Sequence, residues 1–367
     1  MKISGRIILC IAILIAVLGV LSIYSSTYEK EGQGWQDVYK RQILWILFGV
    51  AVFLVMANLD YRNIWEATYF LYAAVLFLLI MVFFLGTTRL GAQRWLRLAW
   101  FNFQPSEVVK LVTVIFLARY YSMKSVNDVS LLVGRLGPLR GLLLPLAGVG
   151  LPALLVIQQP DLGSGAIVLL IFVMMLYLSG VRLKYIVSLL AAVALALPVL
   201  WNLLRGYQRE RLLVFLDPNI DPLGAGYTVI QSKIAIGSSG FFGKGWLSGT
   251  QSQLYFLPES HTDFIFATFT EEWGLFGAGI LLMLYFLLVR QAMIIALRTN
   301  DYFGKMLALG ICVMIAIQVS VNIAMTLGLA PVVGLPLPLL SYGGSSMLVT
   351  FAALGILASI DKRRAVF

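Results

Sequence analysis

Charged side chains that can act as acids, bases or anion binders stand where apolar segments of the sequence begin or end. In Phe103-Gln-Pro-Ser-Glu-Val-Val-Lys110, Glu107 and Lys110 are three residues apart and therefore share one face of a helix. Pro105 suits a first helical position, and the helix dipole favours an acidic residue close behind it. The pair is either a helix-start signal with a neutralising partner or part of a substrate cleft, because intramembrane charges normally face a bundle interior or a cavity.

Two further carboxylates stand at such boundaries. Asp161 lies in Gln158-Gln-Pro-Asp-Leu-Gly-Ser164, so it is either an ordinary turn residue or a carboxylate that faces an outward cavity. Asp263 lies where the chain re-enters an apolar segment, so it is either a helix cap or a candidate general base. His261 is the only histidine, and a structural hydrogen bond at the interface is favoured over acid–base work. No Ser or Cys nucleophile motif accompanies it, so no hydrolase triad is expected.

Two irregular segments complete the set of polar regions. Residues 205–262 include Arg209 and Lys233 and lack strong helical or strand periodicity. A segment of this length is usually functional or disordered, and its apolar and aromatic content argues against disorder. Arginine and lysine above the outer leaflet would attract lipid phosphates. Pro331–Ser346, which contains Ser341, is either a rigid surface turn or a segment buried within protein.

Composition indicates the elements that position these groups. The chain has 367 residues, of which 60% are hydrophobic and only 12% charged, about half the charged fraction of a soluble protein. We expect an all-α integral membrane protein with one polytopic domain over residues 1–367. Ten spans are predicted, with a long extracytoplasmic loop between the seventh and eighth. Their ranges are 7–23, 43–58, 67–85, 105–120, 142–157, 165–179, 185–203, 264–289, 306–330 and 345–360.

The distribution of basic residues predicts the orientation of these spans. The termini and the loops on their side hold 15 Lys and Arg residues, against 11 spread over about twice the loop length on the other side. Both termini are therefore expected in the cytoplasm, with Gly86–Gln104 and Arg205–Thr262 outside. The net charge of +10 is attributed to inner-face loops rather than to nucleic-acid binding. Cys10 and Cys312 lie within apolar spans, so neither a disulfide nor a cysteine metal site is expected.

Several strings resemble the SEDS family (shape, elongation, division and sporulation), whose members are RodA-, FtsW- and SpoVE-like proteins. They occur in the family's order and, with the ten spans, extend the resemblance over essentially the whole chain. Gln231-Ser-Lys-Ile-Ala-Ile-Gly237 and Gly249-Thr-Gln-Ser-Gln-Leu254 are similar to the elongation branch. The family strings are Gly91-Ala-Gln-Arg-Trp95, Gln104-Pro-Ser-Glu-Val-Val-Lys110, Gln159-Pro-Asp-Leu-Gly-Ser164, Pro258-Glu-Ser-His-Thr-Asp-Phe-Ile-Phe266 and Pro336-Leu-Pro-Leu-Leu-Ser-Tyr-Gly-Gly-Ser345. One departure is Phe269-Thr-Glu-Glu-Trp-Gly274, where the family usually has small and aliphatic residues; it leaves the assigned site intact.

The resemblance implies a peptidoglycan glycosyltransferase in the bacterial inner membrane that polymerises lipid II at the outer face, releases undecaprenyl pyrophosphate, and serves cell elongation and rod shape. Asp263 matches the family's catalytic carboxylate, with the role of general base. The other candidate site residues are expected to bind substrate or support the site. They are Glu107, Lys110, Arg94, Trp95, Asp161, Arg209, Lys233, His261 and Ser341.

The expected partners are a class B penicillin-binding protein, which is a transpeptidase, and other proteins of the elongation complex. A divalent cation, Mg²⁺ or Mn²⁺, would neutralise the pyrophosphate, although no ligand set can be read from the sequence, and no organic cofactor is expected. Two alternative functions are a lipid II flippase and a non-catalytic activator of the transpeptidase. The flippase would need polar groups that continue to the inner leaflet, whereas the candidate groups are expected near the outer surface.

Overall fold

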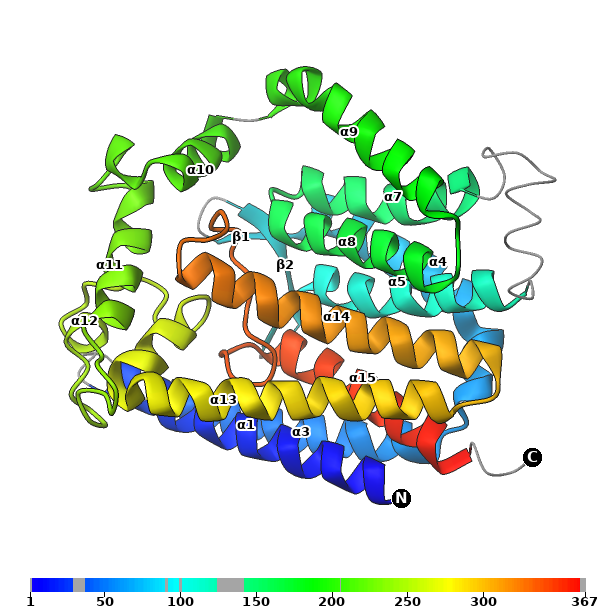
Figure 1. The fold of residues 1–367 in the computed structure, drawn as a ribbon, viewed down its shortest axis with the longest axis horizontal. Helices are drawn as coiled ribbons and strands as arrows, with labels where there is room; N and C mark the ends of the chain where they lie inside the picture. Colours follow the sequence, from blue (N-terminus) through cyan, green and yellow to red (C-terminus); the bar gives the residue numbers. More distant parts are fainter. Residues whose placement is uncertain are drawn as a thin grey trace.

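A computed structural model gives the fold of the chain (Figure 1). It describes residues 2–28, 37–89, 92–98, 101–123, 142–204 and 206–363. Six cations used in the orientation prediction lie outside the described residues: Lys30, Lys124, Arg135, Arg140, Arg205 and Arg364.

One helix occupies each of the ten predicted ranges, with ends that differ from the prediction by a few residues in most cases. Six of them, α1, α3, α4, α13, α14 and α15, are long and apolar enough to cross a membrane, and α7, α8 and most of α9 are shorter apolar helices. The protein is therefore a nearly all-helical, multi-pass membrane protein. The ten helices are α1 (Ile3–Thr27), α3 (Val38–Asn58), α4 (Tyr61–Leu85), α5 (Pro105–Ser122), α7 (Leu144–Gln158), α8 (Leu162–Leu178), α9 (Leu183–Leu203), α13 (Ile265–Arg298), α14 (Tyr302–Thr326) and α15 (Gly344–Arg363).

Local signals explain where several helices begin. Asp60 accepts a hydrogen bond from the backbone N–H of Arg62 at the start of α4, and Asp301 accepts one from Gly304 at the start of α14. Pro105 occupies the first turn of α5, where its missing N–H costs no helical hydrogen bond. These caps satisfy N–H groups that lipid could not satisfy.

The helices α5, α14 and α15 lie within the bundle and are largely buried, whereas α3, α4 and α9 expose many large apolar side chains. Close backbone approach fixes part of this packing. A Cβ at Gly19 of α1 would lie 2.5 Å from the carbonyl oxygen of Leu340, so α1 packs directly against the segment between α14 and α15. This segment, residues 327–343, has no helix or strand.

The structure adds detail to the two loops that were predicted to lie outside. A small antiparallel sheet has the order β1-β2-β3, with β1 (Thr87–Arg89), β2 (Ala92–Leu98) and β3 (Phe101–Phe103). The segment expected to lack periodicity contains α10 (Gly206–Leu216), a 3-10 helix η2 (Pro218–Ile220), α11 (Ala225–Gly237) and α12 (Thr250–Gln253). These helices are short and lack a long apolar stripe, because α10 and α11 pack over the end of the bundle rather than through it (Figure 1).

The start of α1 and the end of α15 lie at the same end of the bundle, as an even number of crossings requires (Figure 1). The helices α10, α11 and α12 lie toward the opposite end. The prediction that the termini face the cytoplasm therefore places α10–α12 outside.

Cysteine labelling tests this orientation. Ser248 is exposed in the segment between α11 and α12, whereas Ser252 is fully buried and would be a poor probe. In a Cys10→Ser, Cys312→Ala background, we expect a membrane-impermeant maleimide to label Ser248→Cys in intact spheroplasts. The control is Asn300→Cys, in the exposed turn between α13 and α14, which should react only after the membrane is opened. The reverse pattern would show that the chain is inverted.

Candidate active site

Asp263 directly precedes α13, but it does not cap that helix. The N-cap residue is Phe264, and no side chain provides a cap hydrogen bond. The backbone of Asp263 is held instead by Asn322 of α14, whose Nδ2 donates to the carbonyl oxygens of Asp263 (2.9 Å) and Leu335 (2.6 Å). The helix-cap alternative is therefore wrong for this residue.

The surroundings of Asp263 change its acidity. Burial raises the pKa of the carboxyl from its usual value of 3.8 to about 7, even though the side chain keeps partial contact with solvent. The negative charges of Glu259 and Asp161 raise the pKa further, whereas the guanidinium groups of Arg94 and Arg211 lower it. In the described part of the chain, no side chain donates a hydrogen bond to this carboxylate. Asp263 is therefore partly protonated near neutral pH and can exchange a proton there.

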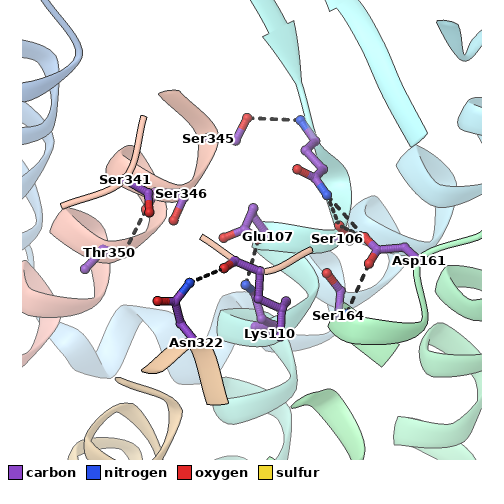
Figure 2. Close-up of polar contacts among 12 residues, drawn as sticks. Ser106, Glu107, Lys110, Asp161, Ser164, Asn322, Ser341, Ser345, Ser346 and Thr350 are labelled. Carbon is purple, nitrogen blue, oxygen red and sulfur yellow. Dashed lines mark hydrogen bonds and ion pairs between the residues drawn. The ribbon is translucent and has the colours of Figure 1, made fainter. Parts of the chain in front are cut away.

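Asp161 lies at the centre of a buried hydrogen-bond network (Figure 2). Its Oδ1 accepts the backbone N–H of Ser164 at 3.1 Å, and its Oδ2 accepts from Ser106 Oγ at 3.0 Å and Gln104 Nε2 at 3.1 Å. Arg94 Nη1 lies 3.9 Å from Oδ1. Asp161 is thus the cap of α8, as the turn interpretation suggests, and it joins β2 and the start of α5 to the α7–α8 turn. Its side chain is buried in this network and does not line an open cavity.

Glu107 and Lys110 contact one another, as their spacing predicts. Lys110 Nζ lies 2.7 Å from Glu107 Oε1, and both side chains are almost fully buried. Figure 2 shows the pair between the Asp161 network and Asn322. The two charges therefore neutralise each other inside the bundle, next to the residues that hold Asp263, and they do not form a surface ion pair.

The centre of the segment between α14 and α15, residues 337–341, is buried in protein, so this part is not a surface turn. Ser341 Oγ donates to the carbonyl oxygen of Thr262 at 2.6 Å and accepts the backbone N–H of Leu337 at 2.7 Å. The N–H of Tyr342 donates to the carbonyl oxygen of His261 at 3.0 Å. Ser341 and the backbone carbonyl of His261 thus hold the segment after α14 against the segment that contains Asp263. The role of the His261 imidazole stays a prediction.

The basic residues of the outer segment have different positions. Arg209 Nη2 donates to the carbonyl oxygen of Asn202 at 2.8 Å and so ties α10 to the end of α9. Lys233 is exposed, and its stem lies against Gly328 at the end of α14. Neither is among the groups that shift the pKa of Asp263, whereas Arg211 is. Trp95 lies partly buried on β2, opposite Thr87 of β1.

Similarity to known proteins identifies the family of the chain. The profile of the FtsW, RodA and SpoVE family, described as a cell cycle protein, matches residues 5–365. The chain belongs to this family. It is 43% identical to the peptidoglycan glycosyltransferase MrdB of Escherichia coli K12 over 354 residues, which cover 96% of this chain and 93% of MrdB.

Two solved structures share the fold of this FtsW/RodA/SpoVE chain. The first comes from a study of how a peptidoglycan synthase complex coordinates polymerization and crosslinking; it has a TM-score of 0.82 and 32% identity, and covers 98% of this chain and 97% of its own. The second is the rod shape determining protein RodA of Thermus thermophilus, with a TM-score of 0.71, 26% identity, and coverage of 98% and 96%. The similarity to MrdB and RodA agrees with the predicted elongation branch.

Glu271 and Glu272, which lie within the string that departs from the SEDS pattern, belong to a separate polar cluster on α13. Glu271 Oε1 lies 2.7 Å from Lys244 Nζ and accepts from Thr250 Oγ1 at 3.0 Å. Glu272 accepts a hydrogen bond from Ser25 of α1. Neither carboxylate is among the groups that shift the pKa of Asp263, so the cluster anchors the outer segment and α1 to α13.

Four residues of the site were not predicted as site residues: Arg211, Glu259 and Asn322 near Asp263, and Gln104 beside Asp161. Only the folded chain shows that Arg211 and Glu259 influence Asp263. Asn322 lies in an apolar stretch with no charged residue, where the usable signal is that Asn322 and Gln318 are its two carboxamides.

The Glu107–Lys110 pair predicts a specific pattern of stability. Glu107→Gln and Lys110→Met should each cost about 3–5 kcal/mol, because each leaves an unpaired charge in the bundle. The double variant should be more stable than the sum of the single changes, since no buried charge remains. Thermal unfolding of the purified protein in detergent measures the three effects. Additive losses would show that the two side chains do not depend on each other.

Proposed function

We propose that this protein polymerises lipid II into glycan strands at the outer face of the bacterial inner membrane during cell elongation, with Asp263 as the general base. The single observation that carries the proposal is the carboxyl of Asp263, with its pKa near 7, beside Arg94 and Arg211. Relatives named as peptidoglycan glycosyltransferases support the reaction class. The loop charges support a topology with both termini in the cytoplasm.

In the proposed reaction, the growing strand attached to undecaprenyl pyrophosphate is the donor, and lipid II is the acceptor. Asp263 takes the proton of the acceptor's GlcNAc 4-hydroxyl while the hydroxyl oxygen attacks the anomeric carbon of the donor. The bond from that carbon to the pyrophosphate oxygen breaks, and its electron pair leaves with the pyrophosphate. Inversion converts the α-linkage into a β-1,4 bond. A well-placed base contributes about 10²–10⁴-fold to such a step.

Arg94 and Arg211 would stabilise the leaving pyrophosphate. Guanidinium groups bind phosphate oxygens in bidentate geometry and stabilise the charge that develops on a leaving pyrophosphate. The same positive charges oppose the effect of burial on Asp263, so part of the carboxyl remains deprotonated near neutral pH. The two arginines therefore support both the base and the leaving group.

A divalent cation remains part of the proposal. Among the described residues, no three His, Cys, Asp or Glu side chains lie close enough together to hold a metal ion. Mg²⁺ at phosphate sites commonly takes only one or two carboxylates and completes its shell with phosphate oxygens and water. Asp263 is partly exposed and fits such a cation, which would neutralise charge on the pyrophosphate when bound. Asp161 fits it less well, because it is buried and both of its oxygens already accept hydrogen bonds.

The proposed partner is a class B penicillin-binding protein within the elongation complex. Support comes from the similar structure described in terms of polymerization and crosslinking by one peptidoglycan synthase complex. Coupling a polymerase to a crosslinking enzyme would deliver each new strand directly for attachment.

Asp263→Asn tests the mechanism. The amide keeps the size of the side chain but cannot accept the hydroxyl proton, so we expect glycan-strand formation from purified lipid II to fall by at least about 10²-fold. The matched control is Asp217→Asn in the outer segment, where Asp217 only caps the 3-10 helix and is exposed. This control should polymerise normally. Both variants should insert and co-purify with the partner transpeptidase.

Two readouts of that variant and one of the wild type separate the alternatives. Near-normal polymerisation by a well-expressed Asp263→Asn protein would contradict a general base at this position. Loss of polymerisation with intact transport of lipid II across proteoliposomes would indicate that a flippase activity accompanies the polymerase. Absence of polymerisation by the wild type with an active-site-blocked partner would favour a non-catalytic activator.

The pH dependence follows from the pKa of Asp263. A base must be deprotonated, so kcat/KM should rise with pH, with an inflection near pH 7, and fall about tenfold for each pH unit below it. Glu259→Gln removes a negative charge that raises the pKa, so the profile should move to lower pH. A profile that does not move in this variant would contradict the assignment of the inflection to Asp263.

The raised pKa of Asp263 also makes the stability of the folded protein depend on pH. The folded-state pKa lies above the unfolded value, so folding favours the protonated form, and this carboxyl destabilises the fold increasingly as pH rises from about 4 to about 7. Asp263→Asn should therefore unfold at a higher temperature than the wild type at pH 8 and at a similar temperature at pH 4. Thermal scans at the two pH values check the difference.

A further inference from the structure

A basic hollow lies between the start of α1 and the end of α13, at the end of the bundle where the chain termini lie. Its volume is about 550 Å³. Lys2 and Arg6 contribute from α1, and Arg298 contributes from the last turn of α13. Asp263 precedes the other end of α13, so this hollow is separate from the candidate active site.

The three cations that line the hollow have no acidic partners among the described residues. Other basic side chains of the bundle, such as Lys110, Lys244 and Arg363, form ion pairs with carboxylates. Three like charges that converge on one hollow repel one another and raise its positive potential. An anion in the hollow would remove this repulsion.

Polar groups with free hydrogen-bonding capacity complete the lining. Ser4 is more than nine-tenths buried, lines the hollow and forms no side-chain hydrogen bond with a described group. The first turn of α1 contains no acidic residue, and Lys2 provides no side-chain cap, so the N–H groups of this turn have no side-chain acceptor. Helix N-termini of this kind bind phosphate readily. Gln291 supplies a further amide to the lining.

The hollow also has an apolar side. Ile3, Ile7 and Ile294 line it, and Ile3 is 77% exposed. Because α1 and α13 are both long and apolar enough to cross the membrane, these side chains lie where a lipid's glycerol backbone and acyl chains would begin. Basic pockets between transmembrane helices are typical binding sites for anionic lipid headgroups.

We propose that this hollow binds the phosphate of an anionic phospholipid headgroup, with its acyl chains along the isoleucines. Arg6 and Arg298 would hold the phosphate from two different helices, and Ser4 with the first-turn N–H groups would complete its hydrogen bonds. The lipid would thereby join the start of α1 to the end of α13. This site goes beyond the polymerase reaction and does not depend on it.

Lipid titration of the purified full-length protein tests the proposal. In a zwitterionic detergent, short-chain phosphatidylglycerol should raise the unfolding temperature with an apparent affinity at least about tenfold higher than that of short-chain phosphatidylcholine. Arg6→Gln/Arg298→Gln should weaken the binding of phosphatidylglycerol at least about tenfold, to the level of phosphatidylcholine. Arg6→Lys/Arg298→Lys should retain most of the affinity, because it keeps both charges.

The matched control is Arg182→Gln/Lys184→Gln, which neutralises two exposed cations at the start of α9, outside the hollow. Phosphatidylglycerol affinity should not change in this variant. An equal loss in both neutralised variants, or no preference for phosphatidylglycerol in the wild type, would overturn the proposal. Inorganic phosphate that binds as tightly as phosphatidylglycerol would show a free-anion site and would overturn the lipid assignment. If the double variant does not fold, Arg298→Gln alone tests the proposal. It should lower the affinity for phosphatidylglycerol about threefold.

Discussion

The centre of the irregular segment between α14 and α15, residues 337–341, is buried in the bundle. Water cannot reach its backbone there, so side chains from distant helices supply hydrogen bonds. Gln42 of α3 donates to the carbonyl oxygen of Ser341 at 3.1 Å, and Tyr285 of α13 donates to that of Pro338 at 2.6 Å. The side-chain amide of Asn322 donates to the carbonyl oxygens of both Leu335 and Asp263. The position of the candidate base therefore depends on the same hydrogen bonds that allow irregular backbone in the bundle.

The site uses buried charge in two ways. Glu107 and Lys110 are paired at hydrogen-bonding distance, so their charges cancel and the pair contributes mainly to structure and local potential. Asp263 has arginines near enough to change its pKa, but no described side chain donates a hydrogen bond to its carboxylate. A directly paired carboxylate would bind a proton too weakly to act as a base near neutral pH. The charges of Arg94 and Arg211 oppose the effect of burial without a direct hydrogen bond, so the pKa of Asp263 stays near 7.

The sequence predicted the features that depend on the membrane and on local turn chemistry. Ten apolar ranges correspond to ten helices because a hydrocarbon layer demands long apolar helices, and the contact between Glu107 and Lys110 follows from helical spacing. Features that depend on how distant segments meet could not be predicted. Arg209 and Arg211 lie on different faces of α10. Arg209 points toward the end of α9, whereas Arg211 lies close enough to Asp263 to lower the pKa of its carboxyl. Asn322 gains its role only because residues 331–343 return beside α14.

The hydrogen bonds around the irregular segment also determine when the site is complete during biosynthesis. Gln42 and Ser341 are 299 positions apart in the chain, and Thr262 accepts its hydrogen bond from a serine 79 positions later. A ribosome-bound chain that has inserted everything up to α13 already carries Asp263 but lacks the residues that hold it. The newly made protein therefore gains the contacts that hold Asp263 only after α14 and the segment that follows it have been made.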